Sequence, residues 1–206
     1  LDAGLYLQEN EILWARNGKT EHIISVEELN ILGAHNYENV MAAVALCDGM
    51  GVPMETIREG LRAFHAVEHR IEFVCKKNDI AFYNDSKGTN PDAAIKGIQA
   101  MNRPTLLIGG GYDKQSTYEE WIQAFDGKVR FLVLIGDTKE KIAKAARNVG
   151  FNDITMADNL KEAVQICHDK ANAGDAVLLS PACASWDQFK SYEQRGELFK
   201  EYVRAL

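Results

Sequence analysis

Long apolar runs are missing from this sequence of 206 residues. A helix needs about 20 consecutive apolar residues to span a bilayer, and no segment reaches that length, so no membrane partner is expected. The first residues also lack the basic start and apolar middle of a signal peptide. Positive charge is scarce as well, since 23 Lys and Arg face 30 Asp and Glu and the net charge is -7. This balance predicts no nucleic-acid partner, because a nucleic-acid surface needs clustered basic residues.

Cysteine is also scarce, and its four positions are Cys47, Cys75, Cys167 and Cys183. None of them has the spacing of a metal-binding or redox pair. We interpret them as reduced thiols of a cytosolic protein. His65 and His69 lie four residues apart, but no second pair of ligands accompanies them. The sequence therefore predicts no metal site of its own.

Two common nucleotide-binding motifs are absent. Asn17-Gly18-Lys19-Thr20 looks like the end of a phosphate-binding P-loop, but Leu13 stands where that motif needs glycine. No Gly-x-Gly-x-x-Gly follows the first strand of the later α/β region, which leaves dinucleotide binding without support. Asn17-Gly18 instead predicts a tight hairpin turn between strands at 12–14 and 22–24.

Residues 1–68 are predicted to hold this hairpin and two helices. The apolar spacing predicts one helix over residues 36–50, and a second helix opens at Pro53, a favoured first position. The second helix is expected to bury Ile57, Leu61 and Phe64. The pattern changes around residues 66–70, where we predict a domain boundary.

Residues 69–206 alternate between strand and helix patterns. Strands are predicted at 71–75, 80–84, 105–108, 131–135 and 176–179, with a short one near Ile154. Helices are predicted to begin near Pro91, Thr117, Lys139 and Leu160, and a long last one after Ser185. Three of the strands are continuous apolar runs, typical of a parallel sheet that helices cover on both faces. The predicted fold is therefore α/β, with a Rossmann-like domain and a mainly parallel sheet after the hairpin and helices.

Polar segments follow three of the predicted strands, at 84–90, 109–114 and 180–185. Ligands of open parallel sheets bind beyond the carboxyl ends of the strands, so we expect these segments to share one site. Lys87 and Lys114 would supply positive charge there. Thr89 and Ser185 would supply hydroxyl groups, and a helix after Ser185 would add free N–H groups. This inventory predicts a small ligand with two carboxylates, whose charges need such partners when they leave water.

Each of these residues also has a simpler interpretation. Ser185 and Gln188 have the spacing of a capping box, so the hydroxyl could cap the last helix. Lys87 and Lys114 could be ordinary surface charges. Tyr192, three residues after Phe189, could be a core residue. Their joint placement at strand ends favours the functional interpretation.

Four motifs together resemble the Mur ligase family. They are Asp85-Ser86-Lys87-Gly88-Thr89-Asn90, then Gly109-Gly110-Gly111-Tyr112-Asp113-Lys114, then Ser180-Pro181-Ala182-Cys183-Ala184-Ser185-Trp186-Asp187-Gln188-Phe189 continuing to Glu193-Gln194-Arg195-Gly196, and upstream Gly33-Ala34-His35-Asn36-Tyr37-Glu38-Asn39 with His69-Arg70. The resemblance implies that residues 1–68 are the C-terminal portion of a central ATP-binding domain. Residues 69–206 would then be a C-terminal amino-acid-binding domain. The Asp-Ser-Lys-x-Thr-Asn form is similar to that of members that add D-glutamate.

The resemblance also implies an activity. Such a ligase would use ATP and Mg²⁺ to join D-glutamate to UDP-N-acetylmuramoyl-L-alanine through an acyl phosphate, forming ADP, in peptidoglycan synthesis in the cytoplasm. The Mg²⁺ ligands and the UDP-binding domain of the family lie mostly outside this sequence. We therefore expect a fragment that is inactive alone, and a monomer.

Roles for single residues follow from the resemblance only. Lys87 would be catalytic, near the reacting phosphate or the γ-carboxylate of D-glutamate. Substrate contacts are implied for Thr89, Lys114, Ser185, Trp186 and Tyr192. ATP contacts are implied for Asn36, Asn39 and Arg70 near the base and phosphates, and for Asp85 near the ribose. Tyr192 and Trp186 depart from the family's common Phe and Leu.

Two alternatives stay open at this point. One is a related ligase that adds another amino acid, such as a folylpolyglutamate synthase. The other is a non-catalytic nucleotide-binding module of Rossmann-like fold.

Overall fold

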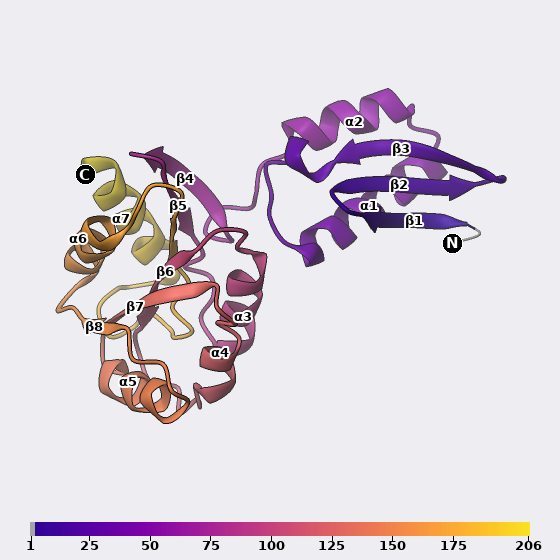
Figure 1. Ribbon diagram of the computed structural model, residues 1–206. Helices are drawn as coiled ribbons and strands as arrows, with labels where there is room; N and C mark the ends of the chain where they lie inside the picture. Colours follow the sequence, from indigo (N-terminus) through magenta and orange to yellow (C-terminus); the bar gives the residue numbers. More distant parts are fainter. Residues whose placement is uncertain (1–2) are drawn as a thin grey trace. The chain divides into compact units, whose positions relative to one another are not determined.

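The computed structural model describes residues 3–206, which form two compact units, 3–66 and 67–206 (Figure 1). The first unit contains an antiparallel sheet of β1 (Gly4–Gln8), β2 (Glu11–Arg16) and β3 (Lys19–Ser25), in that order. The predicted hairpin is confirmed. Asn17 and Gly18 both have positive φ, 53° and 71°, as the mirror-image turn between twisted strands requires. β1 was not predicted. It is an edge strand whose five residues are only half-buried or exposed, and its pairing with β2 defines it.

Two helices pack against this sheet, α1 (Ala34–Gly49) and α2 (Met54–Ala63), and a short 3-10 helix, η1 (Val26–Glu28), follows β3. Ile12, Ile24, Val44 and Ile57 are buried between them. The prediction that Phe64 is buried was wrong, since its side chain is 52% exposed. The helix ends at Ala63 and Phe64 has an extended backbone, so its side chain leaves the buried face of α2.

The second unit is built on a sheet of six strands. They are β4 (Glu72–Lys77), β5 (Ile80–Asn84), β6 (Thr105–Gly110), β7 (Val129–Ile135), β8 (Ile154–Met156) and β9 (Ala176–Leu179). Their order in the sheet is β4-β5-β9-β6-β7-β8. All neighbouring pairs are parallel except β4 with β5. The prediction of a mainly parallel sheet is confirmed.

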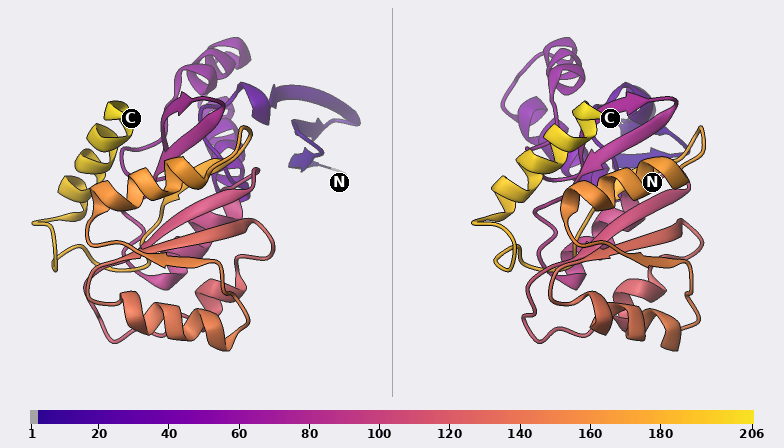
Figure 2. Two further views of the ribbon diagram at one scale, coloured as in Figure 1. Left: turned by 60° about the vertical axis from the view of Figure 1, so that its left-hand side comes forward. Right: turned by 90° about the vertical axis from the view of Figure 1, so that its left-hand side faces the viewer.

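Helices cover both faces of this sheet (Figure 2). They are α3 (Pro91–Ala100), α4 (Glu119–Gln123), α5 (Lys139–Asn148), α6 (Leu160–Lys170) and α7 (Tyr192–Ala205). Phe82 of β5, Ile108 of β6 and Val177 of β9 belong to one hydrophobic core on the same face of the sheet. Val164 of α6 and Phe199 of α7 pack against them there. Helices α3, α4 and α5 lie on the other side of the sheet. The buried strands therefore have the continuous apolar sequences that the prediction used.

The last helix begins later than predicted. Residues 185–189 form only a turn, in which the Ser185 carbonyl accepts the N–H groups of Gln188 and Phe189. Helix α7 starts at Tyr192, and the side chain of Ser191 caps it by accepting the N–H of Gln194. Ser191 and Gln194 repeat the spacing of Ser185 and Gln188, and the later pair sets the helix start.

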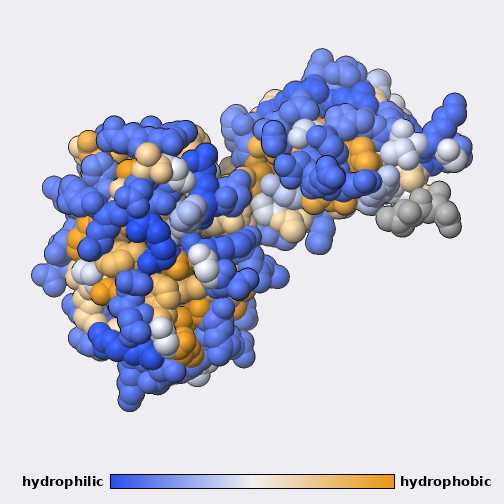
Figure 3. Space-filling view, viewed as in Figure 1, coloured by the Kyte–Doolittle hydropathy of each residue, from blue (hydrophilic) through white to orange (hydrophobic). Residues whose placement is uncertain are grey.

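The outer surface of each unit, in the view of Figure 3, is mostly hydrophilic, with smaller hydrophobic areas. Among residues 3–206, no helix combines the length and the apolar run that a bilayer span requires.

Candidate functional site

The three polar segments predicted to share a site follow three adjacent strands. Because β9 lies between β5 and β6, the carboxyl ends of these strands sit side by side. The loops also bond to one another: the Gly110 N–H donates to the Pro181 carbonyl at 2.8 Å, and the Tyr112 N–H donates to the Ala184 carbonyl at 2.9 Å. Ser180 Oγ donates to the Asp85 carboxylate at 2.7 Å. The segments after β5, β6 and β9 therefore form one continuous surface.

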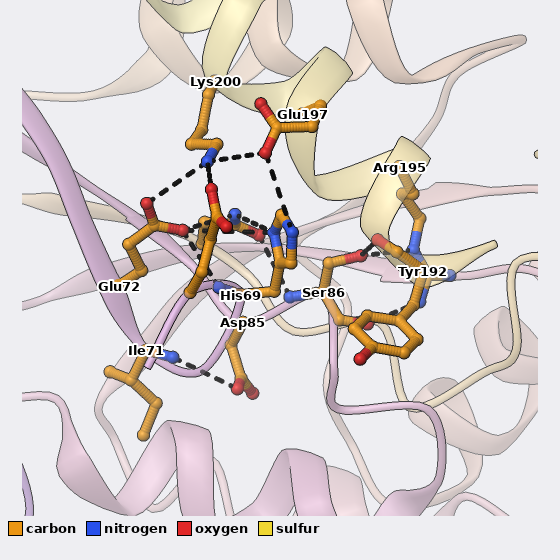
Figure 4. Close-up of polar contacts among 11 residues, drawn as sticks. His69, Ile71, Glu72, Asp85, Ser86, Tyr192, Arg195, Glu197 and Lys200 are labelled. Atoms are coloured by element: carbon orange, nitrogen blue, oxygen red, sulfur yellow. Dashed lines mark hydrogen bonds and ion pairs between the residues drawn. The ribbon is translucent and has the colours of Figure 1, made fainter. Parts of the chain in front are cut away.

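Arg195 of α7 ties the loop after β5 to the loop after β9, and Figure 4 shows its side chain beside Ser86 of the first of these loops. Its side chain is fully buried. Nε donates to Ser86 Oγ at 3.0 Å and Nη2 to the Ser86 carbonyl at 2.8 Å, while Nη1 donates to the Cys183 carbonyl at 3.1 Å. Burial lowers the pKa of Arg195 to about 10, which still leaves the guanidinium charged at neutral pH. A buried cation thus sets the spacing of the two loops.

No role was predicted for Arg195, although its spacing along the chain carried a signal. Arg195, Phe199 and Val203 recur every four residues, which places the arginine on the buried stripe of α7. An arginine on such a stripe must satisfy its donors inside the protein. Here loop oxygens accept them.

Lys87 and Tyr192, both predicted site residues, lie together. The exposed Lys87 has its Nζ 5.5 Å from the centre of the Tyr192 ring. Ser86 Oγ donates to the Tyr192 carbonyl at 2.7 Å, which holds the start of α7 against the loop after β5. Tyr192 is only half-buried, and its ring meets His69 edge-on at 6.0 Å. Thr89, also half-buried, follows Lys87 in the same loop and donates its N–H to the Lys87 carbonyl at 2.8 Å.

Lys114 and Trp186 form a second group. Nζ of the exposed Lys114 lies 5.1 Å from the centre of the Trp186 ring. Trp186 is 62% exposed and stands 5.6 Å from the ring of Tyr112, which is 41% exposed. Ser185 is buried beside them in the chain. These exposed aromatic rings lie next to a cation in the loops that follow the carboxyl ends of the strands. Such an arrangement is more typical of a ligand-binding surface than of residues that stabilise the fold.

The four predicted ATP-binding residues fall in different units. Asn36 and Asn39 lie on α1 in the first unit, where the Asn36 side chain donates to the Leu32 carbonyl at 2.7 Å. Arg70 and Asp85 lie in the second unit, and the exposed Arg70 is close enough to lower the pKa of Asp85.

Asp85 is buried, with 4% of its surface exposed. Burial raises the pKa of Asp85 to about 7, although hydrogen bonds from Ser180 and from the Ile71 N–H favour the charged form. Both carboxylate oxygens are therefore engaged inside the protein in this structure. The sequence resemblance implied that Asp85 is a site residue. It did not indicate that the Asp85 side chain is buried beneath the loop after β5.

A cluster of charged residues that the sequence did not reveal lies where the second unit begins (Figure 4). Ligand atoms of Glu68, His69 and Glu197 lie within 4.8 Å of one another. Nζ of the buried Lys200 donates to Glu68 at 2.5 Å and to Glu72 at 3.3 Å, and lies 2.8 Å from Glu197. This ammonium already supplies the positive charge that the carboxylates need. The cluster thus fixes residues 68–72 to α7, and we assign no metal to it.

Comparison with known proteins identifies the family. The family model described as "Mur ligase, glutamate ligase domain" matches residues 69–183. A relative from Lachnoclostridium phytofermentans, named UDP-N-acetylmuramoylalanine–D-glutamate ligase, is 56% identical over 206 residues. All of this chain is covered, but the chain spans only 45% of that relative's length.

Solved structures of low sequence identity share the fold. The UDP-N-acetylmuramate-alanine ligase of Thermotoga maritima has a TM-score of 0.68 at 18% identity, with 98% of this chain and 45% of that chain covered. Mycobacterium tuberculosis folylpolyglutamate synthase, solved with ADP, has a TM-score of 0.65 at 15% identity, with 96% of this chain and 46% of that chain covered. The family match, which includes the loops after β5 and β6 and the start of the loop after β9, agrees with the geometry of the site: this chain belongs to the Mur ligase family.

Proposed function

We propose that this chain supplies the amino-acid-binding part of an ATP-dependent, ADP-forming ligase that joins D-glutamate to UDP-N-acetylmuramoyl-L-alanine. The name of the 56% identical relative supports this substrate pair. The observation that carries the proposal is the joining of the three loops by Arg195 and by the bonds of Gly110 and Tyr112. Two of these loops each carry an exposed lysine, Lys87 and Lys114. Two cations on a fixed surface suit an amino acid with two carboxylates.

Within this proposal the loops orient the amino acid and neutralise its charge. Lys114 and Tyr192 hold the carboxylates of D-glutamate together with Thr89 and Ser185, and Trp186 adds a backbone contact. The Ser185 contact requires its hydroxyl to become accessible, since the residue is buried here. Lys87 stands near the reacting phosphate or the γ-carboxylate. The neutral amine of D-glutamate then attacks the acyl carbon of the acyl phosphate and forms a C–N bond. The tetrahedral intermediate breaks its C–O bond to phosphate, inorganic phosphate leaves, and the nitrogen loses a proton to give the amide. The rate gain comes from holding amine and acyl carbon together and from balancing the charge that develops.

ATP is the proposed cofactor, and the ADP bound to the folylpolyglutamate synthase of similar fold supports it. Residues 1–68 would be the end of the central ATP-binding domain, with Asn36, Asn39 and Arg70 near the base and phosphates. A contact between Asp85 and the ribose requires its carboxylate to turn outward, since it is buried here. Mg²⁺ prefers oxygen ligands in an octahedron, so the cluster of Glu68, His69 and Glu197 does not suit it. We propose that the Mg²⁺ ligands lie mostly outside this chain and that the ligase is a cytoplasmic monomer.

Ligand competition tests the proposed substrate. We expect D-glutamate to shift the amide signals of residues 87–89, 111–114 and 185–192 in an NMR titration of this chain, and L-glutamate and L-lysine to shift them far less. Binding of L-lysine in preference to D-glutamate would assign the chain to another ligase. The chain alone is expected to form no amide from ATP, so turnover by it would contradict the fragment proposal.

Lys114→Ala tests the carboxylate contact. In the full-length ligase we expect it to raise the KM for D-glutamate by roughly 10- to 100-fold and to leave the KM for ATP unchanged, since a charge-assisted hydrogen bond contributes about 1.5–3 kcal/mol. Lys144→Ala, which removes an exposed lysine from α5, is the charge-matched control and should change neither constant. An unaltered KM for D-glutamate in Lys114→Ala would remove this residue from the site.

A further inference from the structure

The loop after β7 packs against the loop after β6, which carries Lys114, and is a fourth loop beside the three of the proposed site. β7 neighbours β6, so residues 136–138 lie beside residues 110–114. A Cβ atom on Gly136 would lie 2.7 Å from the Cα of Gly111, and Gly136 has a φ of 75°. The two backbones therefore touch, and glycine is needed for that approach.

Thr138 bonds to Gly111 through both its side chain and its backbone. The Gly111 N–H donates to Thr138 Oγ1 at 3.0 Å, and Oγ1 also lies 3.0 Å from the Gly111 carbonyl. The Thr138 N–H donates to the same carbonyl at 3.1 Å. The side chain is almost fully buried. Gly111 is the residue at which the chain leaves β6 toward Lys114.

The ordinary role of a threonine at this position is not used. Thr138 stands at the N-cap of α5, where a hydroxyl normally accepts an N–H of its own helix. Here the residue has a helical backbone and its side chain makes no cap hydrogen bond. The hydroxyl is turned toward Gly111 instead.

Thr138 also reaches the loop after β9. Oγ1 lies 3.3 Å from Cys183 Sγ, and Sγ lies 3.2 Å from the Tyr118 hydroxyl. Burial raises the pKa of both the Cys183 thiol and the Tyr118 hydroxyl, so both keep their protons at neutral pH. One directed chain satisfies every group: Tyr118 donates to Cys183, Cys183 donates to Thr138, and Thr138 donates to the Gly111 carbonyl. Cys183 lies two residues before Ser185.

We propose that Thr138 is a positioning residue of the amino-acid site, which holds Lys114 and Ser185 in register by bonding Gly111 and Cys183 at once. It makes no contact with the substrate itself. The inference rests on the proposed function, because it assumes that the two loops bind one ligand. It adds a residue from a loop that no motif of the sequence pointed to.

The test uses this chain with Thr138→Val, which keeps the shape and removes the hydroxyl, and Thr138→Ser, which keeps the hydroxyl. We expect Thr138→Val to weaken D-glutamate binding tenfold or more in an NMR titration and to speed amide hydrogen exchange at Gly111. Thr138→Ser should restore the affinity to within about threefold of the wild type. In the full-length ligase, Thr138→Val should raise the KM for D-glutamate and leave the KM for ATP within about twofold.

Thr105→Val is the matched control. Thr105 is buried at the opposite end of β6, where its hydroxyl donates to the Arg103 carbonyl at 2.9 Å. It should lower the melting temperature without changing D-glutamate affinity. The inference is overturned if Thr138→Val keeps the wild-type affinity, or if Thr138→Ser is as weak as Thr138→Val. If the wild type binds no D-glutamate, the proposed substrate fails, and the exchange rate of the Gly111 amide alone then decides whether Thr138 holds the loop.

Discussion

Asp85 is a carboxylate that the protein buries at the edge of its own site. Its oxygens accept hydrogen bonds from the Ile71 N–H at 3.3 Å and from Ser180 Oγ at 2.7 Å, yet burial outweighs these bonds and raises the pKa to about 7. An unfolded aspartate has a pKa of about 3.9. The folded state therefore binds the proton more tightly than the unfolded state between these two values. The stability that this proton binding by Asp85 adds to the folded state is fully present below about pH 4. It is lost as the pH rises through about 7.

Asp85→Asn should remove this dependence, because asparagine resembles the protonated acid and the Ser180 hydroxyl can accept from its amide group. Relative to the wild type, the variant should gain at most about 1.4 kcal/mol of stability per pH unit between pH 5 and pH 7, and nothing further above pH 8. Urea unfolding at pH 5, 6, 7 and 8 measures this difference. Parallel stability curves for the two proteins would show that Asp85 is not protonated in the folded state at pH 5.

Gly97 shows how helix α3 packs against the same carboxylate. A Cβ atom at this position would lie 2.7 Å from Asp85 Oδ2 and 2.8 Å from Ser180 Oγ. Alanine is the better helix former by about 0.5–1 kcal/mol, so an open position would gain stability from Gly97→Ala. Overpacking costs about 1–3 kcal/mol, and we expect a net loss of stability.

The control for Gly97→Ala is Gly60→Ala in helix α2, where no heavy atom beyond the neighbouring backbone of the helix itself lies within 4 Å of the added carbon. That variant should be stabilised by about 0.5–1 kcal/mol. The urea midpoint of the second unit should therefore fall in Gly97→Ala, and that of the first unit should rise in Gly60→Ala. Equal gains in both would mean that α3 can move away from Asp85 without penalty.

The elements differ in how far they could be predicted. The predicted strands 80–84 and 176–179 match β5 and β9, because polar residues stand directly before and after their apolar runs. The start of α7 was missed because two Ser-x-x-Gln pairs have the same capping spacing, and only packing decides between Ser185 and Ser191. The meeting of the polar loops followed from a general rule of parallel sheets. The position of β9 between β5 and β6 did not, since strand order is a tertiary property.

Residues that hold the site in shape were the hardest to predict. Arg195 and Lys200 lie on one helix, but their partners come from segments more than a hundred residues earlier or from another loop. Thr138 had an ordinary N-cap interpretation that the structure does not use. Such roles depend on which backbone atoms meet across loops, and no local pattern carries that information.

At the scale of the molecule, the two units have hydrophobic cores with no residue in common. Val44 lies in the core of the first unit and Val177 in the core of the second, and both are fully buried. A unit of about 65 residues buries a smaller share of its surface than one of about 140, so the first unit should be the less stable. We therefore expect two unfolding transitions for this chain, with the first unit melting at the lower temperature.

Val44→Ala and Val177→Ala make the same chemical change in each core and separate these transitions. Each removes buried methyl groups and leaves a cavity, which costs about 1–3 kcal/mol. Val44→Ala should lower only the first transition by several degrees, and Val177→Ala only the second, with a smaller shift per kcal/mol because the larger unit unfolds with more entropy. Calorimetry resolves the two, and fluorescence follows each unit by itself in variants that keep a single tryptophan, Trp14 in the first unit or Trp121 in the second. A single transition that both substitutions lower would mean that the chain unfolds as one cooperative body, and the boundary near residue 66 would then have no energetic meaning.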